Sequence, residues 1–221
     1  MKIDAEYIKN LFDEISVYYD KMNNVISLGM HYHIKKSAVK LLDIKPEDKI
    51  IDLCTGTGDI AEIISKMHPA AFVTGIDSSL KMIEIARNKN IRADLQCADV
   101  LNMPFSACSF DCASIAFGLR NIPDRTAALN EINRILKKGG LFLHLDFAGG
   151  SFFSLIYDIF LKIIVRFFNI NISRYEYLIA SKNAYPAPDK LIKEFEQAGF
   201  TLIKRKDFLS GIISAQLLQK K

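Results

Sequence analysis

A short turn with two glycines is the stretch of the chain best suited to binding a ligand. An apolar run leads into Asp52, and Gly56 and Gly58 follow it closely. Glycine adopts positive φ values, and its missing side chain lets a ligand approach the backbone. A helical apolar pattern begins at Gly58, so unpaired N–H groups and the positive end of a helix dipole would face the turn. Asp77 ends the next apolar run, where a carboxylate can accept hydrogen bonds from ribose hydroxyls. Together these residues predict a nucleoside site at the carboxyl end of a parallel sheet.

The residues around this turn bear on which nucleoside is bound. The spacing Gly56-x-Gly58-x-x-Ala61 satisfies the dinucleotide fingerprint, so an NAD-dependent oxidoreductase is one interpretation. Asp52 favours S-adenosylmethionine instead, because a carboxylate would repel a pyrophosphate but can hold the ammonium of a methionine. The pair Asp99-Val100 suits the amino group and the ring of an adenine. Taken singly, Asp52 and Asp99 are also explained as caps of a turn and a loop.

A second group of chemically capable residues follows the fourth predicted strand. The run Ala116-Phe117-Gly118-Leu119-Arg120-Asn121 falls at a carboxyl strand end, where open α/β sheets gather their sites. The methyl group of S-adenosylmethionine would point there, and Arg120 and Asn121 would polarise or orient an oxygen of the acceptor. Simpler roles stay open: Arg120 pairing with Asp124 at the surface, and Asn121 capping the next helix.

The elements that must position these residues alternate between strands and helices, which indicates a parallel α/β sheet. Strands are predicted at 49–54, 72–77, 94–99, 110–116 and 140–147. Helices are predicted at 58–67, 79–88, 124–136 and 188–198, the third stopping at Lys137-Lys138-Gly139-Gly140. Strands at 201–209 and 211–219 are separated only by Ser210-Gly211, which predicts an antiparallel hairpin. A Rossmann-like, seven-stranded α/β sheet that ends in such a hairpin is the class I S-adenosylmethionine-dependent methyltransferase fold.

The segment ahead of the first strand is predicted to be helical. Residues 7–19 place apolar side chains at helical spacing, and helix and turn continue beyond them with a break at Gly29. We therefore predict one methyltransferase domain over 1–221, with 1–45 as an N-terminal helical cap and 151–198 as a helical insertion near the substrate site.

Residues 151–172 are the most apolar stretch of the chain. Asp158, Lys162 and Arg166 lie four residues apart, so a helix places them on one face. Each would cost roughly 2.5–3.5 kcal/mol at the centre of a bilayer. A buried helix with one solvated stripe is therefore favoured over a membrane span. An interfacial helix, or the wall of a channel for a lipid substrate, stays open.

Charge and cysteine content exclude several classes of function. The net charge is only +4 and the basic residues are scattered, whereas a nucleic-acid-binding protein would show a concentrated basic stripe. The four cysteines form no Cys-x-x-Cys pair and have no nearby His pair, so no metal site is expected. Cys54, Cys97 and Cys112 are expected to be buried free thiols in a reducing compartment. The first residues lack the apolar core of a signal peptide, which favours a cytoplasmic protein.

Motifs over nearly the whole chain resemble those of the C-methyltransferases of menaquinone and ubiquinone biosynthesis. The matching stretches are Phe12-Asp13, Tyr18 to Asn23, Asp52 to Asp59, Met103 to Phe105, Phe110-Asp111, Phe117 to Asn121, Arg134 to Gly140, and Tyr175 to Leu178 with Ser181. The glycine turn is shared by many methyltransferases. The combination of Phe-Gly-Leu-Arg-Asn with the amino-terminal Tyr-Asp-x-Met-Asn is specific to this family.

The resemblance implies S-adenosylmethionine as cofactor and a lipid-soluble quinol, most directly demethylmenaquinol, as methyl acceptor. The implied cofactor contacts are Thr57, Asp77, Asp99, Val100 and Ala116. Proton removal from the quinol hydroxyl would activate the ring carbon, and no metal is required. We expect Arg120 and Asn121 to orient the oxygen. Asp146, His144, Tyr185 and a water are the candidate bases.

Three departures from the family lie near the expected acceptor site. Relatives commonly carry Ser at the position of Ala116, a Glu-Phe-Ser run where this chain has Asp146-Phe147-Ala148, and a His near Gln216. A methyltransferase of another aromatic or lipid substrate is therefore one alternative, and a non-catalytic, membrane-associated nucleoside-binding module is another. For a polyprenyl acceptor, residues 151–172 would supply an apolar wall or a membrane-facing surface. Peripheral contact with the inner face of the membrane and a homodimer both stay open.

Overall fold

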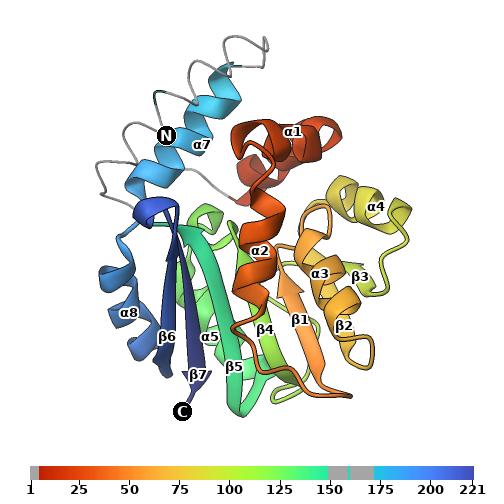
Figure 1. Cartoon of the computed structure of the whole chain (residues 1–221), viewed down its shortest axis with the longest axis vertical. Helices are drawn as coiled ribbons and strands as arrows, with labels where there is room; N and C mark the ends of the chain where they lie inside the picture. The colour runs from red at the N-terminus through yellow and green to blue at the C-terminus, as the bar shows by residue number, and fades with distance from the viewer. Residues whose placement is uncertain (1–4, 149–158, 160–171) are drawn as a thin grey trace.

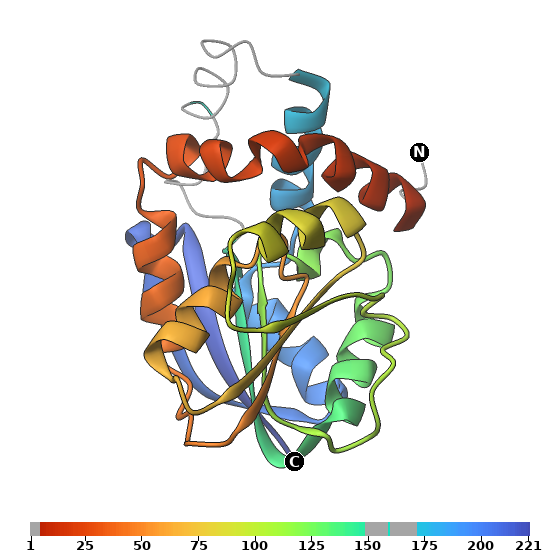
Figure 2. The ribbon, with the colours of Figure 1, turned by 90° about the vertical axis from the view of Figure 1, so that its right-hand side faces the viewer.

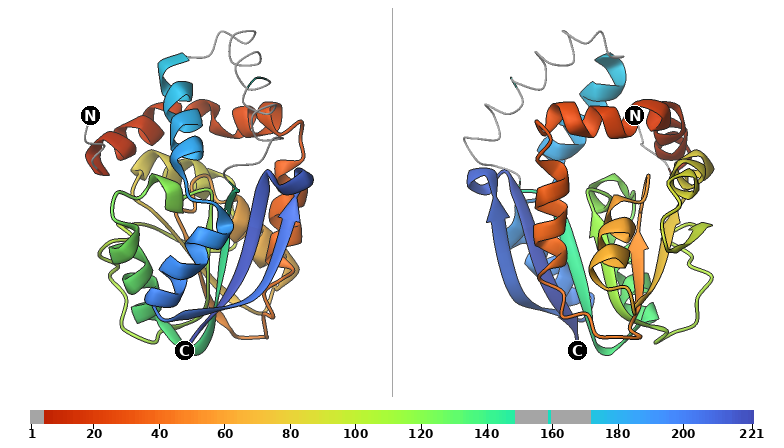
Figure 3. Two further views of the ribbon diagram at one scale, coloured as in Figure 1. Left: turned by 90° about the vertical axis from the view of Figure 1, so that its left-hand side faces the viewer. Right: turned by 45° about the vertical axis from the view of Figure 1, so that its right-hand side comes forward.

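The computed structural model describes residues 5–148, 159 and 172–221, which form a sheet flanked by helices (Figure 1). The strands are β1 Lys49–Leu53, β2 Phe72–Asp77, β3 Asp94–Cys97, β4 Phe110–Ala116, β5 Leu136–Phe147, β6 Phe200–Phe208 and β7 Ile213–Lys220. Their order across the seven-stranded sheet is β3-β2-β1-β4-β5-β7-β6. The first five strands pair in parallel, and β7 pairs antiparallel with both β5 and β6. The predicted fold class is confirmed, with the hairpin at one edge of the sheet (Figure 3).

The two larger apolar cores hold helices on opposite faces of the sheet. The helices are α1 Ala5–Ile26, α2 His31–Val39, α3 Asp59–Met67, α4 Leu80–Asn88, α5 Arg125–Ile135, α7 Ile172–Ala184 and α8 Pro188–Gln197, with short 3-10 turns η1 Leu119–Asn121 and η2 Leu209–Gly211. Ile50 packs in the core that contains α2 and α3, and its neighbour Ile51 packs in the core that contains α5 and α8. This alternation follows from the two-residue period of a strand. Both residues are fully buried.

Helix α1 is positioned over the carboxyl ends of the parallel strands (Figure 2). It continues to Ile26, and the chain turns before α2 begins at His31. Gly29 has a φ of +76° at this turn, which confirms the predicted break. The two helices occupy most of the segment predicted as a cap over 1–45.

Two local predictions need correction. The run Lys137-Lys138-Gly139-Gly140 does not cap α5, because α5 ends at Ile135 and β5 begins at once with Leu136. Leu136 already pairs with Phe110 of β4, and the next pair is Cys112 with Leu141. The residues between Leu136 and Leu141, including both glycines, therefore lie in an irregularity of the strand. The hairpin link is also longer than Ser210-Gly211, since η2 occupies Leu209–Gly211 and β7 begins at Ile213.

The prediction for residues 151–172 falls almost wholly outside the described residues, which include only its positions 159 and 172. It therefore stays a prediction. Among the described residues, no helix is both long enough and apolar enough to cross a membrane.

Gly58 is required by helix packing. It precedes α3 with a φ of +88°, and a Cβ atom at this position would lie 2.4 Å from Ile91 Cδ1 and 3.2 Å from Ala86 Cβ. We expect Gly58→Ala to lower the free energy of unfolding by about 2–5 kcal/mol, from backbone strain and overpacking together. Gly211→Ala is the matched control, because it has a φ of +86° but open space around it. Its expected cost is the backbone strain alone, about 1–2 kcal/mol. Urea titrations that give equal losses would contradict the packing role.

Candidate active site

Two cavities lie side by side beneath α1, at the carboxyl ends of the strands. The smaller one has a volume of about 510 Å³ and the larger one about 610 Å³. The residues that line both cavities are Phe12, Tyr19, Cys54, Ala116 and Phe117. A ligand that fills the smaller cavity and extends beyond these shared residues would therefore reach a second molecule bound in the larger cavity.

The smaller cavity gathers most of the predicted nucleoside contacts. Gly56, Asp77, Asp99, Val100 and Ala116 all line it. The two carboxylate oxygens of Asp77 accept hydrogen bonds from the N–H groups of Gly56 and Ser79, each at 2.9 Å. A carboxylate oxygen can accept more than one hydrogen bond, so Asp77 keeps capacity for hydroxyl donors. Burial raises the pKa of this carboxyl.

Two short hydrogen bonds join helix α1 to the glycine turn and to the residue that caps α4. Ser79 Oγ donates to Asp13 Oδ1 and Thr57 Oγ1 donates to Asp20 Oδ1, both at 2.5 Å. Lys89 Nζ lies 2.6 Å from the other oxygen of Asp20. These contacts hold α1 against the glycine turn, so that the helix forms a wall of both cavities.

Asp52 lies at the polar end of the larger cavity and is almost completely buried. Its carboxylate accepts hydrogen bonds from Thr55 Oγ1 at 2.6 Å and from Ser114 Oγ at 2.8 Å. Burial raises its pKa to about 6, although both hydrogen bonds oppose the rise. The group is therefore mostly ionised at neutral pH, and it can hold a cation that enters the cavity.

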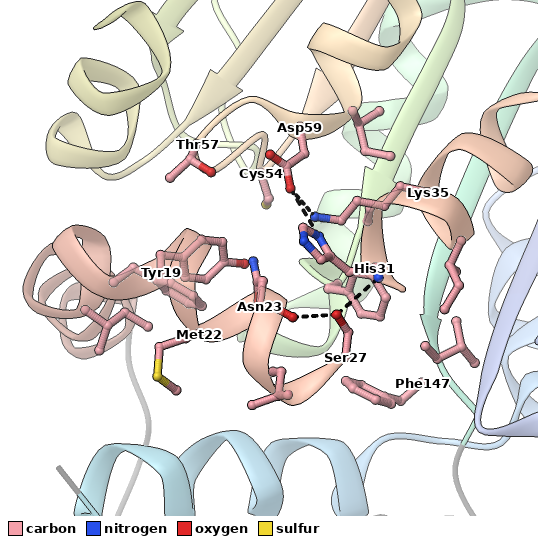
Figure 4. Close-up of a pocket in the computed structure, with 18 of the residues that line it drawn as sticks. Tyr19, Met22, Asn23, Ser27, His31, Lys35, Cys54, Thr57, Asp59 and Phe147 are labelled. Carbon is pink, nitrogen blue, oxygen red and sulfur yellow. Dashed lines mark hydrogen bonds and ion pairs between the residues drawn. The ribbon is translucent and has the colours of Figure 1, made fainter. Parts of the chain in front are cut away.

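Two side chains of α2, His31 and Lys35, approach Asp59 on the wall of the larger cavity (Figure 4). Lys35 Nζ lies 2.7 Å from Asp59 Oδ2, and His31 Nδ1 lies 3.5 Å from the same oxygen. Lys89 Nζ is 3.5 Å from Asp59 Oδ1. With three cationic or polar neighbours, the pKa of Asp59 is held well below its usual range.

Apolar side chains form much of the remaining wall of the larger cavity. They come chiefly from α1, with contributions from α2, β5, α7 and the hairpin: Phe12, Ile15, Met22, Val25, Ile26, Ile34, Phe147, Ile179, Leu209 and Ile213. Tyr19 adds a phenol whose pKa is raised by burial and lowered in part by the charges of Lys35 and Arg120. The cavity therefore suits an apolar molecule with a polar group near Tyr19 and Arg120.

Arg120 is held on the wall of the larger cavity by a buried ion pair. Its Nη1 donates to Asp146 Oδ1 at 2.7 Å and to the carbonyl oxygen of Phe117 at 2.6 Å. Arg120 also lies over the rings of Phe117 and Phe147, 5.8 and 5.2 Å from their centroids. Its Nε atom has no hydrogen-bond partner among the described residues. Arg120 does not pair with Asp124, which instead caps α5 by accepting from Ala127 N–H.

The position of Asp146 argues against proton removal by this residue. Asp146 is fully buried, lines neither cavity, and lies behind Arg120. Asn121 does not cap a helix; it lies in η1, and its Nδ2 donates to the carbonyl of Phe117 at 3.3 Å. Asn121 lines the smaller cavity, whereas Arg120 lines the larger one, so the two predicted acceptor residues face different spaces.

His144 and Tyr185 are also poor candidates for the base, because they hydrogen-bond each other behind the site. The amide nitrogen of Gln216 donates to the carbonyl of Pro188, so its oxygen accepts from His144 Nδ1 at 3.0 Å. His144 Nε2 must then accept from Tyr185 O–H at 2.9 Å. Neither residue lines a cavity. Burial lowers the pKa of His144 and raises that of Tyr185, so both are neutral at pH 7.

This bond predicts a structural cost when Tyr185 is changed. Tyr185→Phe leaves His144 Nε2 buried without a donor, so we expect the free energy of unfolding to fall by about 1–3 kcal/mol. Urea denaturation at pH 7.5 measures the change. Tyr18→Phe is the control, since Tyr18 is 64% exposed, and it should fall within about 0.5 kcal/mol of the parent protein. A Tyr185→Phe protein as stable as the parent would contradict the bonding scheme.

The structure brings together most of the residues selected from the sequence. Asp52, Thr57 and Arg120 line the larger cavity, and Ala116 lines both. Gly58 and Asp146 lie on neither wall. Cys97 is exposed rather than buried, because β3 is the edge strand and Cys97 is its last residue. No cluster that could hold a metal ion occurs among the described residues.

Several residues on the cavity walls were given no role in the site from the sequence: Tyr19, His31, Lys35, Cys54 and Asp59. The aromatic pattern of α1 identified a helix but not which ring faces a ligand. The charges of α2 carry no recognisable spacing. Only their approach to the glycine turn makes them part of the site.

Comparisons with known proteins agree with this geometry. Demethylmenaquinone methyltransferase of Staphylococcus haemolyticus is 36% identical over 96% of this chain and 93% of its own length. The protein of the same name from Staphylococcus aureus is 34% identical, over 98% and 94%.

Solved structures share the fold. An S-adenosylmethionine-dependent methyltransferase from Thermotoga maritima superposes with a TM-score of 0.72 at 21% identity, covering 97% of this chain and all of that one. Phosphoethanolamine N-methyltransferase 2 of Haemonchus contortus, solved with S-adenosylhomocysteine, gives 0.65 at 15% identity, over 85% of this chain and 52% of that one. The model of the ubiE/COQ5 methyltransferase family matches residues 1–220. The chain belongs to the ubiE/COQ5 methyltransferase family.

Proposed function

We propose that the protein transfers a methyl group from S-adenosylmethionine to a ring carbon of a polyprenyl quinol, converting demethylmenaquinol to menaquinol. The relatives named demethylmenaquinone methyltransferase support the substrate, since they match nearly the whole chain. The observation that carries the proposal is the junction of the two cavities. A nucleoside-sized cavity that contains Asp77 and Asp99 meets, at a shared wall, a larger cavity with an extensive apolar wall, beside the buried guanidinium of Arg120.

The residues of the smaller cavity fit S-adenosylmethionine. Asp77 would accept hydrogen bonds from the ribose hydroxyls, and Asp99 and Val100 would hold the adenine. Asp52, which lines the adjoining larger cavity, and the glycine turn would hold the methionine end. When bound, the cofactor supplies an electrophilic methyl group on a sulfonium centre. Ala116, on the wall common to both cavities, would pack at the boundary between cofactor and acceptor.

The protein must activate the acceptor carbon. Loss of a proton from the neighbouring hydroxyl places negative charge on the quinol oxygen and electron density on the ring carbon. The ring carbon that accepts the methyl group must also lose its hydrogen as a proton, and the oxygen regains a proton to restore the aromatic quinol. Arg120 would stabilise that oxygen, because its guanidinium stays cationic and faces the larger cavity. Asp146 would hold Arg120 in this orientation. Since Asp146, His144 and Tyr185 all lie off the cavity walls, we assign the proton acceptor to a water molecule in the larger cavity.

The apolar wall of the larger cavity supports a lipid-soluble partner. Isoprenoid carbon buried there would gain roughly 25 cal/mol for each Å² removed from water. We further propose that the enzyme works in the cytoplasm and meets its substrate at the inner face of the membrane.

The test is methyl transfer in vitro. Purified protein with methyl-labelled S-adenosylmethionine and demethylmenaquinol under reducing conditions should yield labelled menaquinol. Deletion of the gene should lead to accumulation of demethylmenaquinone. An absence of label in the quinone, from protein that binds S-adenosylhomocysteine, would overturn the substrate assignment. An unchanged quinone profile in the deletion strain would do the same.

A further inference from the structure

Lys35 presents an ammonium group to the polar end of the larger cavity. Only 9% of its side chain is exposed, and Asp59 is its one hydrogen-bonded partner among the described residues. An ammonium group has three N–H donors, so two remain for a ligand. The ion pair with Asp59 fixes the side chain on the cavity wall (Figure 4). The charge of Lys35 also acts on Asp52 and Tyr19, which places it in electrostatic reach of both.

The amino end of α3 meets the same corner of the cavity. Asp59 and Ile60, its first two residues, line the larger cavity. The first N–H groups of an α-helix have no acceptor inside the helix, and Gly58 offers no side chain to cap them. A helix amino terminus also carries a partial positive charge. Lys35, which pairs with Asp59 at this terminus, and the N–H groups of the terminus itself therefore supply the hydrogen-bond donors at this corner.

An amino acid has opposite charges at one carbon, and this corner has matching groups. The ammonium of a bound amino acid is attracted to Asp52, whose carboxylate would repel the neighbouring carboxylate. The α-carboxylate must turn away from Asp52, and the donors within the same corner are Lys35 and the start of α3. His31, next to Asp59, adds a further polar neighbour.

We propose that Lys35, together with the amino terminus of α3, binds the α-carboxylate of the amino-acid end of the cofactor. The proposal rests on the proposed function, since it requires S-adenosylmethionine in the adjoining cavities. It gives α2 a direct part in cofactor binding. The same donors would also suit an anionic oxygen of the acceptor, and the experiment separates these two sources.

The test compares two ligands on each variant of the full-length protein by calorimetry. S-adenosylhomocysteine carries the carboxylate, and its decarboxylated analogue keeps the amine but lacks the carboxylate. Hydrogen bonds to charged groups contribute about 1.5–3 kcal/mol, so Lys35→Met should weaken S-adenosylhomocysteine binding about ten- to one-hundred-fold. Binding of the analogue should change by less than about threefold. Lys35→Arg should recover part of the loss. Lys36→Met is the matched control on the exposed side of α2 and should bind both ligands as the parent does.

Partial unfolding would weaken the binding of both ligands equally, so it would leave the ratio of the two affinities unchanged. Equal losses for both ligands, or no loss for either, would overturn the proposal. A raised KM for the quinol with an unchanged affinity ratio would also overturn it, and would assign Lys35 to the acceptor. If the parent protein fails to bind S-adenosylhomocysteine at all, the proposed function itself fails.

Discussion

Arg120→Ala is expected to lower kcat/KM by about 10²- to 10³-fold, because the variant loses the charge that stabilises the developing oxyanion. The binding of S-adenosylhomocysteine should remain close to that of the parent, since Arg120 hydrogen-bonds Asp146 and the carbonyl of Phe117 and none of the residues assigned to the cofactor. Initial-rate assays with reduced quinol and calorimetry with S-adenosylhomocysteine measure the two effects. Arg92→Ala, at an exposed position, is the control and should keep full activity.

The same substitution is expected to destabilise the fold. Asp146 is fully buried, and Arg120 is its ion-pair partner at 2.7 Å. Removing one member of a buried pair leaves an uncompensated charge, at a cost of about 3–5 kcal/mol. The double variant Arg120→Met/Asp146→Asn removes both charges, so it should regain most of the lost stability but none of the activity. A double variant that regains activity would contradict the role assigned to Arg120, and so would an active Arg120→Ala protein.

Asp52→Asn is expected to raise the free energy of unfolding of the ligand-free protein and to weaken its binding of the cofactor. The pKa of Asp52 is about 6 in the fold, against an ordinary value of 3.8. The folded protein therefore keeps a proton that the unfolded chain has released, and ionisation of Asp52 costs stability as the pH rises through 6. A shift of this size corresponds to about 3 kcal/mol, present in full above pH 6 and absent below pH 4.

The gain in Asp52→Asn should therefore depend on pH. At pH 7.5 the variant should be more stable than the parent by up to about 3 kcal/mol, and the difference should shrink as the pH falls toward 4. The hydroxyls of Thr55 and Ser114 can rotate to donate to the amide oxygen of the new Asn side chain or to accept from its amide nitrogen. Urea titrations across this range measure the effect, with Asp43→Asn as an exposed control. Binding of S-adenosylhomocysteine should weaken about ten- to one-hundred-fold. A gain independent of pH, or an unchanged affinity, would contradict the role of Asp52.

Local sequence patterns predicted the presence of helices and strands better than the residues at which they begin and end. Five parallel strands and the edge hairpin were predictable because buried strands are continuous apolar runs bounded by turn residues. The run Lys137-Lys138-Gly139-Gly140 was wrongly predicted to end a helix, because residues that stop a helix also fit an irregular strand. Pairing of Leu136 with Phe110 decided between these conformations, and that pairing is a contact between distant parts of the chain.

The sequence by itself determined the fold class and the donor side of the site, because Gly56, Asp77 and Asp99 follow directly from strand ends. The direction of parallel strands brings those ends together without further information. Only the tertiary structure showed which residues pair with Arg120 and that Asp146 and His144 lie outside the cavity walls. It also showed that Lys35 lies close to the glycine turn. These contacts join residues far apart in the chain. Their existence depends on how helices and strands pack, which no local spacing records.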